Sequence, residues 1–141
     1  TEIYTLSLHD ALPIFLRESS VVNDYTHSLE GEEEIDGRLC YRIIMLAKEN
    51  TDVLWGKQVW WVDKEEFITL KAELYDEDGY LVRTERGMEL KIMDGRFLPS
   101  IIELVPAENP GNKTILNINE MEFNINLDEN FFSQQNMKTI R

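Results

Sequence analysis

The sequence has one cysteine, few basic residues and no long apolar run, and each shortage excludes a class of protein. Cys40 is the single cysteine, so no disulfide can form within the chain. The 14 Lys and Arg residues stand against 27 Asp and Glu residues, which gives a formal net charge of −13. Nucleic-acid binding and docking on an anionic membrane both use basic patches, so we expect neither. No apolar stretch approaches the roughly 20 residues of a transmembrane helix.

The first fourteen residues, from Thr1 to Ile14, read TEIYTLSLHDALPI. This string resembles the in-frame translation of a common sequencing adapter, and Phe15 fits the codon that the adapter leaves open. Segments of such origin are set aside before the fold is considered. We therefore expect residues 1–14 to be an artefact. We also expect natural sequence upstream of Phe15, including a signal peptide, to be missing.

Reactive side chains are not gathered in a pattern typical of catalysis or metal binding. His27 is the one histidine outside the first fourteen residues, and it has no cysteine or histidine partner at zinc-ligand spacing. Cys40 lies in a strand-like run between Leu39 and Tyr41, so we expect a buried thiol rather than a nucleophile. A calcium loop starting at Asp76 fails at its glycine and glutamate positions. We expect no enzyme activity, no catalytic residue, no metal ion and no cofactor.

Apolar and polar residues alternate with a period of two over most of the chain, which is typical of half-buried strands. Asp36-Gly37 and Asp94-Gly95 are hairpin signals, and acidic clusters mark other turns. The expected strands are 25–35, 38–48, 56–62, 67–75, 80–93, 96–105 and 113–124. Tight turns leave no room for the crossovers of a parallel sheet. The sequence therefore predicts a mainly β fold, an antiparallel meander of about seven strands, with a short helix at 128–134.

Four residues predict local features of these strands. Gly87 predicts a bulge or bend, and Pro99 predicts an irregular or edge position. The adjacent Trp60 and Trp61 must point to opposite faces of their strand. We expect Trp61 to face the interior, because its phase matches that of Val59.

Three segments occur in a fixed order along the chain. They read DGRLCYRI from Asp36, WGKQVWWVDKEEFITLKAELYDEDGYLV from Trp55, and IMDGRFLPSIIEL from Ile92. Together they resemble the outer-membrane lipoprotein-sorting proteins of the LolA-like family, over about residues 25–132. The resemblance implies that residues 15–141 are the C-terminal part of a single LolA-like domain.

The resemblance implies an incomplete, half-barrel β-sheet whose apolar concave face holds acyl chains. The implied function is a periplasmic carrier that shields lipoprotein acyl chains, or other lipid, during sorting to the outer membrane. Such transfer needs only binding, since each methylene shielded from water contributes about 0.8 kcal/mol. The implied partners are the lipid or lipoprotein and an inner-membrane lipoprotein-releasing or transport complex.

Alternation within each strand selects the side chains that we expect on the apolar concave face. The lipid-binding candidates are Tyr41, Ile43, Met45, Val59, Trp61, Ile68, Leu70, Leu74, Met88, Leu90 and Ile92. An ordinary core beneath covering helices would use the same side chains, so both interpretations stay open. The alternative function is a non-catalytic β-domain that scaffolds a membrane transport complex through its acidic face. Charge reversal at Glu73 or Glu89 would then impair docking.

Overall fold

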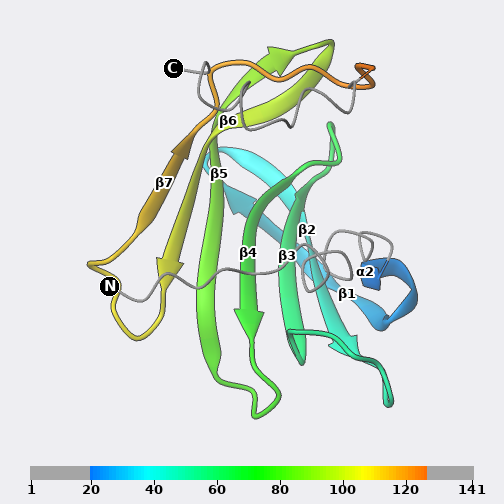
Figure 1. Ribbon diagram of the computed structural model, residues 1–141. Coiled ribbons are helices and arrows are strands. Elements are labelled where there is room, and N and C mark those ends of the chain that lie inside the picture. The colour runs from blue at the N-terminus through cyan, green and yellow to red at the C-terminus, as the bar shows by residue number, and fades with distance from the viewer. Residues whose placement is uncertain (1–19, 127–141) are drawn as a thin grey trace.

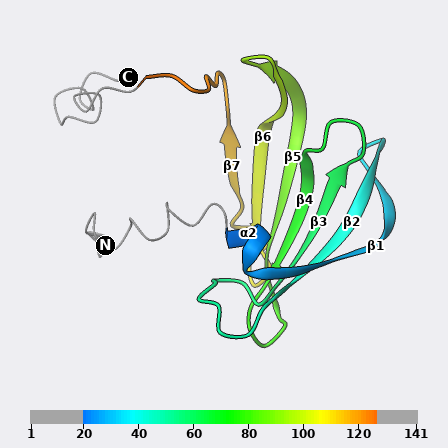
Figure 2. The same ribbon diagram turned by 90° about the vertical axis from the view of Figure 1, so that its right-hand side faces the viewer.

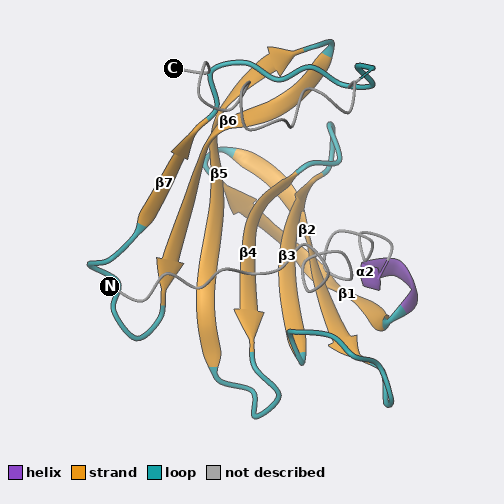
Figure 3. Ribbon diagram, in the orientation of Figure 1, coloured by secondary structure: helices purple, strands orange, loops and turns teal. Residues whose placement is uncertain are grey.

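The computed structural model describes residues 20–126, and almost all of its regular structure is β-sheet (Figure 3). One short helix, α2 (Ser20–Asn23), precedes the strands. The strands are β1 (Tyr25–Ile35), β2 (Arg38–Ala47), β3 (Lys57–Asp63), β4 (Thr69–Tyr75), β5 (Leu81–Met93), β6 (Arg96–Pro106) and β7 (Thr114–Asn117). They form one antiparallel sheet in sequence order, with β1 and β7 as its edges (Figure 1). The predicted mainly β meander is confirmed.

Two hairpin turns follow from residues that tolerate a left-handed backbone. Asp36 and Gly37 have φ angles of 49° and 80°. Asp94 and Gly95 have φ angles of 46° and 74°. Two consecutive positive φ angles are typical of the type I′ turn, whose twist matches that of the flanking strands. The Asp-Gly pairs therefore make the β1–β2 and β5–β6 turns where the sequence predicted them.

The last strand is shorter than the sequence predicted. β7 spans four residues, Thr114–Asn117, within the predicted run 113–124. Further along, the backbone N–H of Phe123 donates to the Asp94 carboxylate at 2.8 Å, so this segment bonds to the β5–β6 turn instead of extending the sheet. The helix predicted at 128–134 lies outside the described residues.

The register of β2 and β3 separates the two faces of the sheet. Trp60 pairs with Ile43, and Trp61 pairs with Arg42. Paired residues project from the same face, so the adjacent tryptophans point to opposite faces, as predicted. We call the face that carries Trp60 the open face and the face that carries Trp61 the core face. Register places Tyr41, Ile43, Met45, Gln58, Trp60, Ala72, Leu74, Arg83, Glu85, Ile102 and Leu104 on the open face, and Cys40, Arg42, Ile44, Val59, Trp61, Lys71, Glu73 and Arg86 on the core face.

The main hydrophobic cluster lies on the core face. Its buried members are Ile35, Cys40, Val59, Trp61 and Leu70, and Ile44, Ile68, Tyr75 and Leu90 pack against them. These side chains come from β1 through β5, so the sheet must curl for them to meet. Cys40 is fully buried, as predicted, and burial is the main reason that the pKa of its thiol is raised.

Contacts between strands that are not neighbours hold this curl. Arg86 of β5 donates through Nη2 to both oxygens of the Asp36 carboxylate at 2.8 Å, which ties the β1–β2 turn to β5. The Arg38 guanidinium of β2 lies 5.6 Å from the centroid of the Phe97 ring of β6. The right-handed strand twist accumulates across the sheet and turns β1 away from β7 (Figure 2). The described sheet is an open half-barrel, with no pairing of β1 to β7.

Asp63 organises the turn between β3 and β4. Its carboxylate accepts two hydrogen bonds from Arg38, at 2.9 Å from Nε and 2.8 Å from Nη2. It also accepts the backbone N–H groups of Glu65 and Glu66 at 3.2 and 2.8 Å. The Arg38 bonds are the first reason that the pKa of Asp63 is lowered, against the opposing effect of burial. The pair therefore fixes one end of the core face.

Candidate functional site

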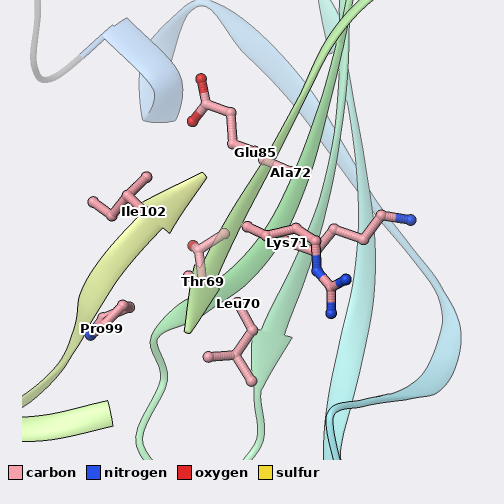
Figure 4. Close-up of a pocket in the computed structure, with 9 residues that line it drawn as sticks. Thr69, Leu70, Lys71, Ala72, Glu85, Pro99 and Ile102 are labelled. Carbon is pink, nitrogen blue, oxygen red and sulfur yellow. The ribbon is translucent and has the colours of Figure 1, made fainter. Parts of the chain in front are cut away.

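A groove crosses the open face over β3, β4 and β5. It has a volume of about 340 Å³ and is lined by Trp55, Gln58, Trp60, Thr69, Ala72, Leu74, Arg83 and Glu85. A recess of about 120 Å³ shares Thr69, Ala72 and Glu85 with it and extends to Gly87, Pro99 and Ile102. Figure 4 shows Glu85 and Ile102 on one side of the sheet, while Lys71 points to the other. We call the two cavities together the open-face groove.

The groove has an apolar floor and walls of mixed character. Ala72 and Leu74 of β4 form the floor, and both are buried. Trp60 rises from β3 and is half-buried, with its indole N–H donating to Gln58 Oε1 at 3.1 Å. Trp55 comes from the loop before β3, and the Tyr25 hydroxyl donates to its carbonyl at 2.7 Å, which anchors this loop to β1. Ligand sites combine apolar lining with polar groups that orient the ligand, and this groove has both.

Two charged side chains of β5 also line the groove. Arg83 and Glu85 form an ion pair, with Nη2 and Oε1 2.5 Å apart. The Arg83 guanidinium carbon lies 5.6 Å from the centroid of the Trp55 ring. Its Nε atom is buried and has no hydrogen-bond partner among the described residues. The groove thus offers one cation, one carboxylate and two indoles.

The structure divides the predicted lipid-binding residues between the two faces. Tyr41, Ile43, Met45 and Leu74 lie on the open face, whereas Val59, Trp61, Ile68, Leu70 and Leu90 belong to the core-face cluster or pack against it. Met88 follows Arg86 by two residues and so continues the core face, and Ile92 near the end of β5 is 76% exposed. Alternation predicted that these residues share one concave face, but they lie on two opposite faces of the sheet.

Register explains this division. The β2–β3 ladder pairs Ile43 with Trp60. The β2 candidates therefore project from the face of Trp60, and Trp61 projects from the other face. A register shift in the β3–β4 ladder follows Trp61, and it puts Leu70 in the core cluster while Leu74 stays on the open face. Shifts of one residue move side chains to the other face, and strand-by-strand alternation does not reveal them.

Sequence reasoning missed most of the groove. Of the predicted residues, Leu74 lines the larger cavity and Leu70 lines the smaller one. Trp55 was not selected because it lies in a loop, and Arg83 and Glu85 were not selected because they are charged. The signal that finds the two charged residues is the β4–β5 register, in which they pair with Leu74 and Ala72 respectively.

A family model described as "Uncharacterized protein" matches residues 15–139. The chain belongs to this family. No curated protein matches the chain significantly. Within residues 20–126, no helix is both long and apolar enough to cross a membrane. The same described residues contain no cluster of three or more His, Cys, Asp or Glu side chains that would suit a metal ion.

Three solved structures are similar to the chain. A DUF1329 family protein from Desulfovibrio piger has a TM-score of 0.72 at 24% identity, covering 92% of this chain and 52% of that one. A structure described as an outer membrane lipoprotein-sorting protein domain, from Vibrio parahaemolyticus, has a TM-score of 0.65 at 25% identity, covering 82% and 48%. A LolA superfamily protein from Nitrosomonas europaea has a TM-score of 0.64 at 25% identity, covering 82% and 51%.

The chain thus spans about half the length of each similar structure. The LolA-like resemblance that the three sequence segments predicted is confirmed by these structural neighbours. The open seven-stranded meander agrees with a LolA-like half-barrel.

Proposed function

We propose that this chain is part of a LolA-like carrier that binds acyl chains in the open-face groove. The observation that carries the proposal is a groove of about 340 Å³ with an apolar floor on the open face, away from which the half-barrel curls, in a fold similar to a lipoprotein-sorting domain. Ligand sites usually measure about 300–1,000 Å³ and bury most of the ligand. Each methylene that leaves water contributes about 0.8 kcal/mol, so an acyl chain gains much from this floor.

Apolar surface continues from the groove toward the β1 edge and supports binding of an extended chain. Ile43 pairs with Trp60 on the open face, and Leu29 of β1 pairs with Ile43. Leu29 is 64% exposed, although it is a large aliphatic side chain. Contiguous exposed apolar surface usually marks an interaction site. The predicted lipid contacts Tyr41, Ile43, Met45 and Leu74 share this face, and we propose that these four, rather than the core-face candidates, serve the ligand.

The cargo that we propose is lipoprotein acyl chains or other lipid, carried in the periplasm. Transfer would occur by binding and release, with no bond made or broken, and the delivering partner would be an inner-membrane lipoprotein-releasing or transport complex. This support comes from the described roles of similar structures, which are a lipoprotein-sorting domain and a LolA superfamily protein.

The scaffold alternative has a specific weakness at Glu73. Its carboxylate accepts the Tyr75 hydroxyl at 2.7 Å and pairs with Lys71 at 2.8 Å, so it belongs to the core face and not to a free acidic surface. The exposed acidic side chains Glu30, Glu32 and Glu34 lie instead on edge strand β1. Glu89 of β5, the other residue named for the scaffold, is exposed, so a docking test should reverse charges at Glu89 and on β1.

The test of the carrier proposal is lipid binding by the purified chain, measured by native mass spectrometry after incubation with bacterial phospholipid. We expect bound lipid, and we expect Ile102→Asn, in the small recess of the groove, to lower occupancy about tenfold because it removes apolar contact area. The matched control is Ile115→Asn on β7, an exposed isoleucine outside the groove. Absence of lipid, or equal loss in both variants, would contradict the proposal.

A further inference from the structure

Arg83 holds a buried donor that its own chain leaves unused. Nη2 is paired with Glu85, but Nε is buried and lacks an acceptor among the described residues. A buried donor without an acceptor destabilises the fold, and more so when the donor is charged. The side chain as a whole is 37% exposed and lines the groove, so a ligand can reach the outer part of the guanidinium, while Nε itself is covered.

Gln58 supplies a second donor to the same groove. The residue is 5% exposed, and its Oε1 accepts the Trp60 indole N–H at 3.1 Å. That bond orients the amide, and the residue lines the groove. Arg83 and Gln58 come from β5 and β3 and line one cavity, with β4 between them. Their donors suit an oxyanion such as a phosphodiester, which guanidinium groups bind with high complementarity.

Glu85 decides which kind of phosphodiester fits. Its carboxylate lines the groove beside Arg83, with 31% of the side chain exposed. A purely anionic head would be repelled by this carboxylate and by the net charge of −13. A head with an ammonium group meets a negative partner in Glu85, and the indoles of Trp55 and Trp60 favour cations over their faces.

We propose that Arg83, Glu85 and Gln58 form a subsite for the zwitterionic head of a phospholipid. The phosphate accepts from the Arg83 guanidinium and from the Gln58 amide, and the ammonium group pairs with Glu85. The acyl chains extend over the apolar floor of Ala72 and Leu74. This inference rests on the proposed function, because the head is placed by chains that lie in the groove.

The test compares two short-chain lipids that differ only in the head group. Diheptanoyl phosphatidylethanolamine and diheptanoylglycerol are titrated into the full chain, with tryptophan fluorescence as the readout. We expect the phospholipid to bind at least about tenfold more tightly, since its phosphate accepts from the guanidinium. Arg83→Gln should abolish that preference, so that the two lipids bind the variant with similar affinity. Arg83→Lys should also lose most of the preference for the phospholipid. Lysine keeps the positive charge but lacks the N–H donors of the guanidinium.

Two controls keep the outcomes apart. Arg96→Gln removes an exposed arginine that stacks on Phe123 outside the groove, and it should keep the preference. Unfolding midpoints of the Arg83 variants should not fall below that of the parent, since both variants remove the unsatisfied donor. If both lipids bind equally well and the Arg83 substitutions do not change their binding, the subsite is overturned and the carrier proposal stands. Tighter binding of diheptanoyl phosphatidylglycerol than of the ethanolamine lipid overturns the role of Glu85. Failure of both lipids to bind overturns the carrier proposal itself.

Discussion

Gly87 of β5 lies so close to Pro99 of β6 that a β-carbon on the glycine would stand 2.7 Å from Pro99 Cγ and 3.0 Å from its Cβ. Gly87 is thus required by close packing at the recess of the open-face groove, and Pro99 forms the opposite wall. The sequence predicted a bulge or bend at Gly87 and an irregular or edge position at Pro99, but both residues pair regularly in the β5–β6 ladder, Gly87 with Ile102 and Pro99 with Leu90.

Gly87→Ala should therefore destabilise the fold by about 1–3 kcal/mol, the usual cost of overpacking. The measurement is the free energy of unfolding in urea. Gly111→Ala is the matched control, because its nearest atom would be 3.5 Å away, and it should change stability little. In a Pro99→Ala background the cost of Gly87→Ala should fall. If the cost is the same in both backgrounds, the Pro99 contact is not its cause.

The neighbouring tryptophans should respond differently to truncation. Trp61 is 3% exposed in the core cluster, so Trp61→Ala should cost about 3–5 kcal/mol of unfolding free energy. Trp60 is half-buried beside the groove, so Trp60→Ala should cost clearly less and should weaken lipid binding instead. Urea denaturation and lipid titration of both variants check this. Equal destabilisation by the two changes would contradict the assignment of the faces.

Asp63→Asn should change how stability depends on pH. The pKa of Asp63 is lowered in the fold by Arg38, so the carboxylate stabilises the fold at pH values above its ordinary value of 3.8. That contribution is lost as the pH falls below 3.8 and through the lowered value. We expect Asp63→Asn to cost about 3 kcal/mol at pH 7, since the loss of one partner of a buried pair typically costs 3–5.

The difference between parent and Asp63→Asn should then shrink as the solution is acidified below pH 3.8. Urea unfolding at several pH values measures it. Asp36→Asn is the control, because the Asp36 carboxylate is 57% exposed and its pair with Arg86 should contribute about 1 kcal/mol or less. A difference that stays constant down to pH 2 would contradict the role of the Asp63 charge.

The order and the bounds of the strands were predictable because their signals are local. The Asp36-Gly37 and Asp94-Gly95 turns need only residues that accept positive φ, and each predicted strand from 25 to 105 agrees with the observed one to within two residues. The end of β7 was not predictable, because it depends on the Phe123 bond to Asp94 in a distant turn.

The composition of the faces was much less predictable. Alternation orders the side chains within one strand, but ladder register sets the phase between strands, and register shifts occur in the β1–β2, β3–β4 and β4–β5 ladders. Leu70 illustrates the consequence, since it was expected with Leu74 and lies in the core cluster instead. A polar substitution at Leu70 would therefore disturb the core cluster as well as the recess, whereas Ile102 and Trp60 line the groove without belonging to that cluster.

The most direct measurement is quenching of single tryptophans by phospholipid with brominated acyl chains, since bromine quenches only nearby indoles. One variant keeps Trp60 with Trp55 and Trp61 changed to Phe, and the other keeps Trp61 with Trp55 and Trp60 changed to Phe. If acyl chains occupy the open-face groove, the lipid quenches Trp60 and leaves Trp61 bright. Quenching of Trp61 with Trp60 unaffected would place the chains on the core face and contradict the groove, and quenching of neither would contradict acyl-chain binding altogether.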